Sequence, residues 1–375
     1  MKEKTVGIVG GGQLGRMLAD AARTLGVRTV VLDPSARGPA GQVADVAVVG
    51  NFTEHAPVTE LAKQCDVMTF EIESANLPAL QELVASGFEV HPNPDTLLII
   101  KDKLTQKQLL QNAGIPVGDF MQIASKEDAL RAGEIFGYPY VLKARSGGYD
   151  GRGNRTVTSP EVIETTIAAL GGGALYAEKM IPFEKELAVV AVRTKDGQKA
   201  VYPIVETIHQ NHICHMTLVP APVPADIAMQ AHDIAERVLS AFSGAGVFAV
   251  EMFLCDGKVL VNEIAPRVHN SGHWTIEGCD TSQFENHIRA VAGLPLGSVQ
   301  QKHPASVMVN ILGDRNAPAN PVGVEEAEAL GNVSVHIYGK ADTKIERKMG
   351  HVTVVGDTLS EVQQKAEQAR KLIHI

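Results

Sequence analysis

The first part of the chain alternates short apolar runs with segments of helical period. The apolar runs that predict strands lie at 5–9, 28–33, 46–49 and 67–70. Helical periodicity follows the first run over 13–25, where Leu14, Met17 and Leu18 fall on one face, and returns at 54–64 and 77–86. Strands that alternate with helices in this way form a parallel sheet covered by helices. We therefore expect a doubly wound, Rossmann-like N-terminal domain over residues 1–97.

The pattern changes after a helical connector at 94–113, which contains a helix at 104–112. Residues 118–177 predict a small α/β lobe that ends at a run of glycines, 171–173, and could move as a lid. Longer strands then flank turn signals, and a helix covers 226–242 with Ile227, Ile234 and Val238 facing inward. We expect an α/β protein (α+β overall) with a larger antiparallel sheet in the domain 98–297 and a strand-rich closing unit at 298–375.

Composition narrows the class of protein without naming a function. The chain has 375 residues, 45% of them apolar, and a net charge of −9, which gives no general affinity for nucleic acid. Four separate cysteines without CxxC spacing indicate reduced thiols, as in the cytoplasm. No apolar run approaches the ~20 residues of a membrane span, and the N-terminus does not resemble a signal peptide.

The stretch 141–154, VLKARSGGYDGRGN, is the first candidate for chemistry. A predicted strand delivers Lys143 to a loop with glycines at 147, 148, 151 and 153. Glycine lets backbone N–H groups approach a polyanion, and Lys143, Arg145 and Arg152 add positive charge. The stretch therefore indicates a cover for phosphates, although a plain glycine-tipped hairpin has the same pattern.

A second glycine motif, Gly10 to Gly15, follows the first strand and fits GxGxxG, with Asp33 ending the next strand. This pattern is typical of a dinucleotide site, but by itself it indicates only a phosphate at a helix N-terminus. The sequence Phe70-Glu71-Ile72-Glu73 ends another strand, at the edge where such sheets bind ligands. For Glu71 and Glu73, a solvated strand end is an equally good interpretation.

Two carboxylates, Glu251 and Glu263, lie on consecutive apolar strands joined near Asp256-Gly257. Paired buried carboxylates repel each other unless a cation lies between them, and hard oxygen ligands suit Mg²⁺. A two-residue turn would place Glu251 opposite Asn262 and send Glu263 to the other face. We therefore predict a three-residue loop, 256–258, which places the two glutamates opposite each other.

Three other polar groups remain open to interpretation. His209, His212 and His215 recur at spacing three, but on a strand these positions face opposite sides, which disfavours a metal site. The run 265–274 is dense in polar groups and favours a binding loop. Lys340, Lys344, Arg347 and Lys348 form either a binding patch or a solvated face.

Taken together, these motifs resemble those of the ATP-grasp ligases, and within them the N5-carboxyaminoimidazole ribonucleotide synthetase family of purine biosynthesis. The segments that carry the resemblance are GGGQLGRM at 10–17, KLTQK at 103–107, LKARSGGYDGRGN at 142–154, EKMI at 178–181, HQ at 209–210, EMF at 251–253, NEIAPRVHNSGHWT at 262–275 and ERKMGHVTV at 346–354. They run along the whole chain, and the pairing of GGYDGRGN with APRxHNSGH is specific.

The resemblance implies an ATP-grasp fold and a ligase. Its reaction would turn ATP, bicarbonate and 5-aminoimidazole ribonucleotide into N5-carboxyaminoimidazole ribonucleotide, ADP and phosphate, through carboxyphosphate. It also implies ATP and Mg²⁺ without biotin, a cytoplasmic homodimer, and no nucleic-acid or membrane partner.

Roles follow for individual residues. ATP would be bound by Lys103, Lys143, Gly148, Tyr149, Asp150, Gly151, Arg152, Gly153, Asn154, Glu178, Lys179, Met180, Ile181, Glu186, His209, Asn262 and Glu263. Mg²⁺ would be held by Glu251 and Glu263. Catalysis would use Tyr149, Asp150, Arg152, Arg267, His269 and Lys348. The ribonucleotide would contact Gln13, Leu14, Glu73, Lys340, Arg347 and Lys348.

The sequence departs from the family pattern at two positions. Lys103 stands where some relatives have arginine, and Ala265 stands where many ATP-grasp enzymes have a metal-binding asparagine. Three other functions remain to be tested: a formate-dependent glycinamide ribonucleotide ligase of similar plan, an NAD-dependent oxidoreductase based on Gly10–Gly15 and Asp33, and a non-catalytic nucleotide-binding regulator.

Overall fold

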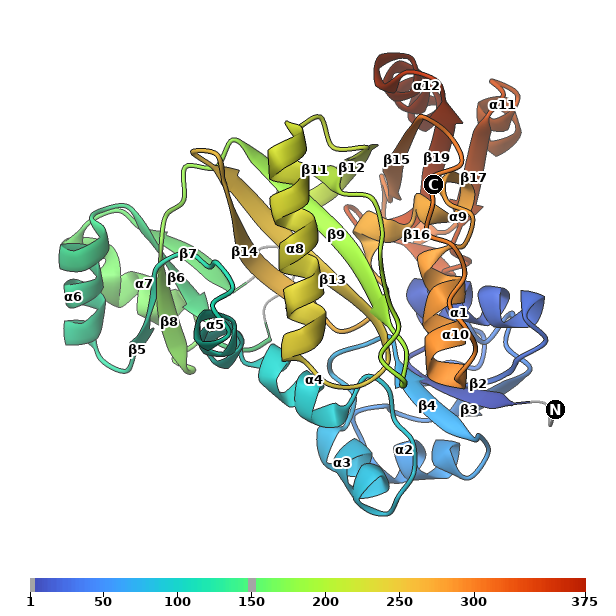
Figure 1. Ribbon diagram of the computed structural model, residues 1–375, viewed down its shortest axis with the longest axis horizontal. Coiled ribbons are helices and arrows are strands. Elements are labelled where there is room, and N and C mark those ends of the chain that lie inside the picture. Colours follow the sequence, from blue (N-terminus) through green and yellow to red (C-terminus); the bar gives the residue numbers. More distant parts are fainter. Residues whose placement is uncertain (1–3, 148–152) are drawn as a thin grey trace.

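Four parallel strands form the sheet of the N-terminal region, with the bounds that the apolar runs predict (Figure 1). The computed structural model describes residues 4–147 and 153–375. The strands are β1 (Thr5–Val9), β2 (Arg28–Asp33), β3 (Val46–Val49) and β4 (Val67–Phe70), in the order β3-β2-β1-β4. The helices are α1 (Gln13–Thr24), α2 (His55–Ala62) and α3 (Leu77–Ala85). Because the strands are parallel, the loops after β1 and β4 meet at the same edge of the sheet.

Two helices, α4 (Pro94–Lys101) and α5 (Lys103–Asn112), connect this region to the rest of the chain. Asp102 separates them because its backbone is extended, and its carboxylate accepts hydrogen bonds from the N–H groups of Leu104 and Thr105. A side-chain acceptor at this position caps the free amides of α5. The same carboxylate accepts from Arg145 of the next lobe at 2.9 Å, which fixes α5 against that lobe.

The small lobe lies at one end of the molecule and has its own sheet and core (Figure 1). Its sheet has the order β5-β8-β6-β7 and is antiparallel. The elements are β5 (Phe120–Ile123), α6 (Lys126–Phe136), β6 (Tyr140–Ala144), β7 (Asn154–Val157), a 3-10 turn (Pro160–Val162), α7 (Ile163–Ala169) and β8 (Leu175–Lys179). The glycine loop joins β6 to β7, and five of its residues, 148–152, lie outside the described residues.

A nine-stranded sheet forms the centre of the molecule, in the order β14-β13-β9-β11-β12-β15-β19-β17, with β10 beside β9. Its strands are β9 (Lys185–Arg193), β10 (Lys199–Val201), β11 (Val205–Gln210), β12 (Ile213–Val219), β13 (Gly246–Cys255), β14 (Lys258–Ala265), β15 (Ala305–Leu312), β17 (Val333–Ile337) and β19 (Lys348–Gly356). The short strands β16 (Ala317–Pro318) and β18 (Asp342–Thr343) pair separately. Strands from the predicted closing unit therefore extend the central sheet.

Helices cover both ends of this sheet. The long helix α8 (Ala225–Ala241) lies across β9, β13 and β14, and its predicted inner residues Ile227, Ile234 and Val238 are buried (Figure 1). Each such side chain contributes about 1.5–3 kcal/mol of stability through burial. The other helices are α9 (Thr275–Gly278), α10 (Gln283–Ala292), α11 (Val324–Glu328), α12 (Leu359–Leu372) and a 3-10 turn (Asn270–Gly272). Because α10 contacts α1, β4, β9 and β13, it joins the N-terminal region to the central sheet.

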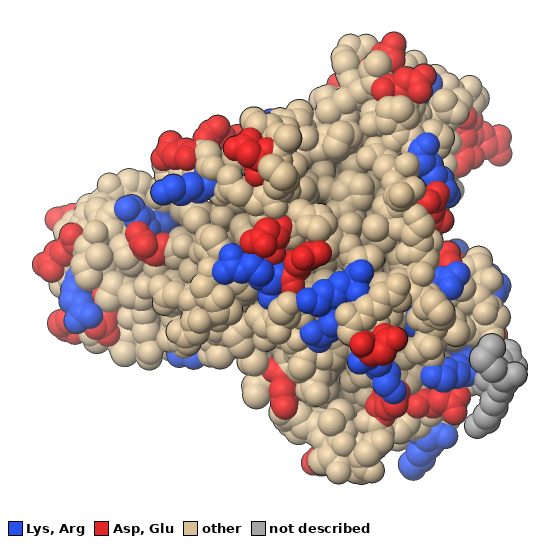
Figure 2. Space-filling view, viewed as in Figure 1, with Lys and Arg blue, Asp and Glu red and all other residues tan. Residues whose placement is uncertain are grey.

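Charges on the molecular surface are mixed in sign. Figure 2 shows lysines and arginines interspersed with aspartates and glutamates on one face. None of the described helices combines the length and the apolar composition that crossing a bilayer requires.

Candidate active site

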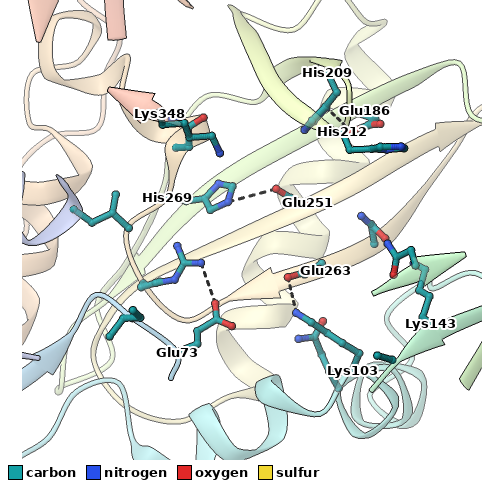
Figure 3. A pocket seen from close by; sticks show the side chains of 18 of the residues that line it. Glu73, Lys103, Lys143, Glu186, His209, His212, Glu251, Glu263, His269 and Lys348 are labelled. Atoms are coloured by element: carbon teal, nitrogen blue, oxygen red, sulfur yellow. Dashed lines mark hydrogen bonds and ion pairs between the residues drawn. The ribbon is translucent and has the colours of Figure 1, made fainter. Parts of the chain in front are cut away.

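A cavity of about 1000 Å³ lies where the N-terminal region, α5, the small lobe and the central sheet meet (Figure 3). Most of the residues that sequence motifs single out line this cavity, although they come from distant parts of the chain. They are Gln13, Leu14, Glu73, Lys103, Lys143, Asn154, Glu186, His209, Glu251, Asn262, Glu263, Arg267, His269 and Lys348. In Figure 3, Lys143 and Lys103 lie on one side of the cavity and Lys348 and His269 on the other, with Glu251 and Glu263 between.

Glu251 and Glu263 are paired across β13 and β14, as predicted, but the predicted three-residue loop is wrong. Asp256 and Gly257 form a two-residue turn with φ values of 49° and 70°, and Cys255 pairs with Lys258. Such a turn matches the twist of the strands, which favours it over longer loops. The register is corrected further along, where an extra residue, Asn262, produces a β-bulge.

The two carboxylates differ in their surroundings. Burial and repulsion from Glu263 raise the pKa of Glu251 to about 7. Burial would also raise the pKa of Glu263, but attraction to Lys103, whose ammonium lies 2.5 Å from Oε1, lowers it instead. His269 Nε2 lies 3.4 Å from Glu251. A cation bound between the two carboxylates would relieve their repulsion. Two carboxylates with the side-chain amide of Asn262 nearby are oxygen ligands of the kind that Mg²⁺ prefers.

Beside this pair, the base of the small lobe holds a cluster of charges around Glu178. Lys143 on β6 lies 2.7 Å from Oε2 of Glu178, and Lys107 on α5 lies 3.1 Å from Oε1. Burial would raise the pKa of Glu178, but attraction to Lys107 and Lys143 lowers it to about 2. Burial lowers the pKa of Lys107, and attraction to Glu178 opposes that change. The carboxylate of Glu178 is therefore ionised between two ammonium groups.

Residues 178–181, which the resemblance assigns to the adenine, differ in position. Glu178 is buried and paired, whereas Met180 has 37% of its surface exposed. Lys179, Met180 and Ile181 are not among the described residues that line the cavity. An aromatic residue that sequence reasoning missed, Phe253, does line it and stacks on Phe183 with ring centroids 4.6 Å apart.

Glu186 and His209 form an ion pair on adjacent strands of the cavity wall. The distance from His209 Nδ1 to Glu186 Oε2 is 2.7 Å. The register of the pairing between β11 and β12 shifts between Ile208 and His209. Burial by itself would lower the pKa of His209, but the hydrogen bond and attraction to Glu186 raise it. His212 also lines the cavity, whereas His215 does not, and the described residues contain no cluster of three side chains suited to a metal.

The loop after β14 forms the other end of the cavity. The amide of His269 donates to Gln283 Oε1 at 2.9 Å, and Gln283 Nε2 donates to the carbonyl of His269 at 2.6 Å. Arg267 pairs with Glu73 at 3.0 Å, which joins this loop to the N-terminal region (Figure 3). Because both contacts cross between elements, the loop side chains are held in place.

The basic patch is divided by the structure. Lys348 lines the cavity, but Lys340 and Arg347 are not among its described lining residues. Lys340 Nζ instead donates to the carbonyl of Lys348 at 2.6 Å, and Arg347 Nη1 donates to the carbonyl of Asp342 at 2.8 Å. Lys340 therefore supports the strand that presents Lys348.

The Gly10–Gly15 turn is occupied by acidic side chains. The amide of Gly11 donates to Asp33 at 3.0 Å and the amide of Gly12 donates to Glu71 at 2.7 Å. Burial raises the pKa of Glu71, and the hydrogen bond from Gly12 opposes this. Because the N–H groups of Gly11 and Gly12 already donate to Asp33 and Glu71, the dinucleotide interpretation loses both of its supports, the free amides and the free Asp33 carboxylate.

Some predicted site residues lie outside the described part of the chain, and some residues that line the cavity had no predicted role. The residues Gly148, Tyr149, Asp150, Gly151 and Arg152 lie outside the described residues. Gly153 accepts a hydrogen bond from the amide of Ala144 at 2.8 Å, which begins the β6–β7 pairing. Lining residues that no role was assigned to include Gln106, Lys107, Tyr176, His212, Phe253, Asn270 and His273. Four of them belong to the KLTQK and NSGH motifs, so their place in these motifs could have identified them as site residues.

Three family models match successive parts of the chain. The ribonucleotide synthetase preATP-grasp domain matches residues 3–101, and the ATP-grasp domain matches residues 108–284. The phosphoribosylaminoimidazole carboxylase C-terminal domain matches residues 306–365.

Known proteins are similar over nearly the full chain. The N5-carboxyaminoimidazole ribonucleotide synthase of Synechococcus elongatus is 38% identical over 98% of this chain and 93% of its own length. The phosphoribosylaminoimidazole carboxylase of Ogataea methanolica is 43% identical over 97% of this chain, which spans 69% of that longer protein. In the similar carboxylase of Candida albicans the chain spans 66% of the length.

Solved structures agree with this result. The N5-carboxyaminoimidazole ribonucleotide synthetase of Thermotoga maritima superposes with a TM-score of 0.90 at 41% identity, covering 99% of both chains. The enzyme of Aspergillus clavatus, in complex with ADP and 5-aminoimidazole ribonucleotide, gives a TM-score of 0.91 at 39% identity, covering 99% of this chain and 98% of its own. The chain therefore belongs to the N5-carboxyaminoimidazole ribonucleotide synthetase family of ATP-grasp ligases.

Proposed function

We propose that the protein carboxylates 5-aminoimidazole ribonucleotide with bicarbonate at the expense of ATP. The observation that carries the proposal is similarity to such enzymes over nearly the full chain, combined with one cavity that is lined by residues from every matching motif except EKMI at 178–181. In the first step an oxygen of bicarbonate attacks the γ-phosphorus of ATP and ADP leaves, which gives carboxyphosphate. The exocyclic amine of the ribonucleotide then takes up the carboxyl group, directly or as released CO₂, and phosphate is set free.

The first step places three anions together, so positive charge and position are the main requirements. Lys103 and Lys143 would contact ATP phosphates, with residues 148–154 as their cover, and Glu186 with His209 would hold the ribose. The Glu178–Ile181 segment would present backbone groups to the adenine. Glu251 and Glu263 would hold Mg²⁺ beside Asn262, and the bound ion would supply positive charge to the phosphate oxygens. Lys103 lies 2.5 Å from Oε1 of Glu263, so binding of Mg²⁺ there would require Lys103 to exchange this carboxylate for a phosphate.

The second step would occur at the far end of the cavity. Arg267, His269 and Lys348 line that end, and Tyr149, Asp150 and Arg152 are assigned there by the resemblance. Burial and nearby cations, Arg267 foremost, lower the pKa of His269, so its imidazole is neutral at neutral pH. A neutral imidazole can accept a proton from the substrate amine. Gln13, Leu14 and Glu73 would contact the ribonucleotide. Lys340 and Arg347 would act indirectly, by supporting the segment that presents Lys348.

A coupled assay tests this function. ADP release should require both bicarbonate and 5-aminoimidazole ribonucleotide, and ADP formed equally fast without the ribonucleotide would contradict the proposal. Lys348→Ala should lose the ribonucleotide-dependent ADP release but still bind ADP. Lys344→Ala, an exposed lysine in the same segment, is the matched control and should keep the activity of the unmodified protein.

The state and location of the protein are part of the same proposal. We infer a cytoplasmic homodimer from the family resemblance, and the four cysteines, all in described residues, form no disulfide, as a reducing compartment requires. The mixed charges in Figure 2 offer no continuous basic track for nucleic acid on that face. Light scattering of the purified protein should give twice the chain mass of 40.0 kDa, and the chain mass alone would refute the dimer.

A further inference from the structure

Lys107 is a buried lysine that the proposed reaction does not use. Its side chain is only 3% exposed, although it borders the cavity from α5. The ammonium lies 3.1 Å from Oε1 of Glu178 and donates to the carbonyl of Val261 at 3.2 Å. Burying a lysine costs free energy unless a partner compensates the charge, so this position needs a reason.

Glu178 has a second partner in Lys143, which approaches its other oxygen at 2.7 Å. The carboxylate therefore holds one ammonium on each oxygen. One carboxylate with two ammonium groups carries a surplus positive charge, and this surplus faces a cavity suited to phosphates. If either lysine turned away, the other would still compensate Glu178.

The two lysines differ in how firmly they are held. Lys107 is anchored to a backbone carbonyl of β14 as well as to Glu178. Lys143 stands at the end of β6 beside the glycine loop, lines the cavity, and has a side chain that is 15% exposed. Of the two, Lys143 is the one that can exchange Glu178 for a ligand in the cavity.

We propose that Lys107 is a positioning residue that holds the charge of Glu178, so that Lys143 is released to a phosphate of the nucleotide. The inference rests on the nucleotide half of the proposed function. Without Lys107, Lys143 would be the one remaining ammonium of this cluster that compensates the charge of Glu178, although Tyr176 also hydrogen-bonds to it. A phosphate would then have to compete with a buried carboxylate for that ammonium. Removing the negative charge of Glu178 should abolish this competition.

The test compares the binding of MgADP with that of adenosine, by calorimetry, in Lys107→Met, Glu178→Gln and the double variant. Adenosine reports the base and ribose contacts, and the ratio of the two affinities isolates the phosphates. In Lys107→Met the affinity for MgADP should fall tenfold or more, which is about 1.4 kcal/mol, while adenosine changes less than threefold. In the double variant the ratio should return to within threefold of that of the unmodified protein.

A purely structural role gives a different result. If Lys107→Met weakens MgADP and adenosine equally, or if Glu178→Gln fails to restore the ratio, the proposal is overturned. If Lys107→Met does not fold, the double variant decides alone, because it contains no unpaired carboxylate: a low ratio overturns the proposal and a normal ratio supports it. Lys126→Met is the matched control. Lys126 also pairs with a glutamate, Glu164, at 2.6 Å, but on the exposed surface of the small lobe that contains Glu178.

These measurements separate this inference from the proposed function. Binding of MgADP needs no turnover, so the result stands whichever ribonucleotide is the substrate. Failure of the unmodified protein to bind MgADP would instead remove the ATP-dependent function itself.

Discussion

Acid should detach the N-terminal region from the central sheet by protonating His287. This buried residue of α10 lies between the two regions. Its Nδ1 accepts a hydrogen bond from the amide of Val247 on β13 at 3.0 Å, and its Nε2 lies 2.7 Å from Thr69 Oγ1 on β4. Because an amide can only donate, Nδ1 carries no proton, and the proton on Nε2 is donated to Thr69. A second proton would place one N–H against another.

The size of the effect follows from the pKa. Burial, with a smaller contribution from nearby His91, lowers the pKa of His287 from 6.5 to about 3. Between these values the unfolded chain binds a proton that the folded chain excludes, so stability is complete above pH 6.5 and is lost as the pH falls toward 3. At pH 4.5 the loss amounts to about 2.7 kcal/mol, at 1.36 kcal/mol for each pH unit below 6.5.

Urea unfolding at pH 7.5 and pH 4.5 measures this loss. The fluorescence of Trp274, which shares a core cluster with Phe284 and Ile288 of α10, reports on the correct region. His287→Gln can still accept from Val247 and donate to Thr69 but cannot take up a proton, so its unfolding free energy should fall by about 2–3 kcal/mol less than that of the unmodified protein. Other histidines titrate in both proteins and cancel in the comparison. Equal losses in the two proteins would refute the reasoning, and His232→Gln, at an exposed position of α8, should match the unmodified protein.

Two other substitutions test the cavity and the glycine turn. Gly11→Ala should lower the unfolding free energy by about 1–3 kcal/mol, because the new Cβ would lie 2.6 Å from Cβ of Asp33. Gly173→Ala, whose Cβ would meet nothing within 4 Å, is its control, and equal urea midpoints would contradict the explanation. Lys103→Met should raise the KM for ATP about tenfold or more, as expected for a lost charge-assisted hydrogen bond. An unchanged KM in steady-state assays would remove Lys103 from the phosphate site, and Lys101→Met, outside the cavity lining, is its control.

The elements of the fold were predictable where burial determines the sequence pattern. The parallel strands β1 and β4 are buried on both faces and mostly apolar, so their bounds could be taken directly from the sequence. The helix α8 has one buried face, and its periodicity identified the inward residues. The start of α5 was predicted within one residue, but the cause of the break before it was not, because that depends on Asp102 capping one helix while binding Arg145 of another lobe.

The hairpin of Glu251 and Glu263 shows a correct pairing reached by wrong reasoning. The sequence Asp256-Gly257 is typical of a two-residue turn. The longer loop, 256–258, was predicted only because it places the two carboxylates opposite each other. The protein keeps the two-residue turn and adds a bulge at Asn262. Local sequence does not predict such a bulge, since twist and contacts with the rest of the sheet stabilise it. Asn262, the bulged residue, lines the cavity, whereas Ala265 does not.

Sequence shows which charged residues are present but not which of them are paired. The Gly10–Gly15 motif fits a dinucleotide site until Asp33 and Glu71 are found on its amides. In the same way, Lys143 was expected to contact a phosphate, and in the structure its ammonium forms an ion pair with the carboxylate of Glu178. Every nucleotide-side cation described here therefore has an anionic partner before a ligand arrives, and binding must be an exchange of partners. The affinity for ATP then depends on how well each abandoned carboxylate is compensated, and for Glu178 the compensating group is Lys107.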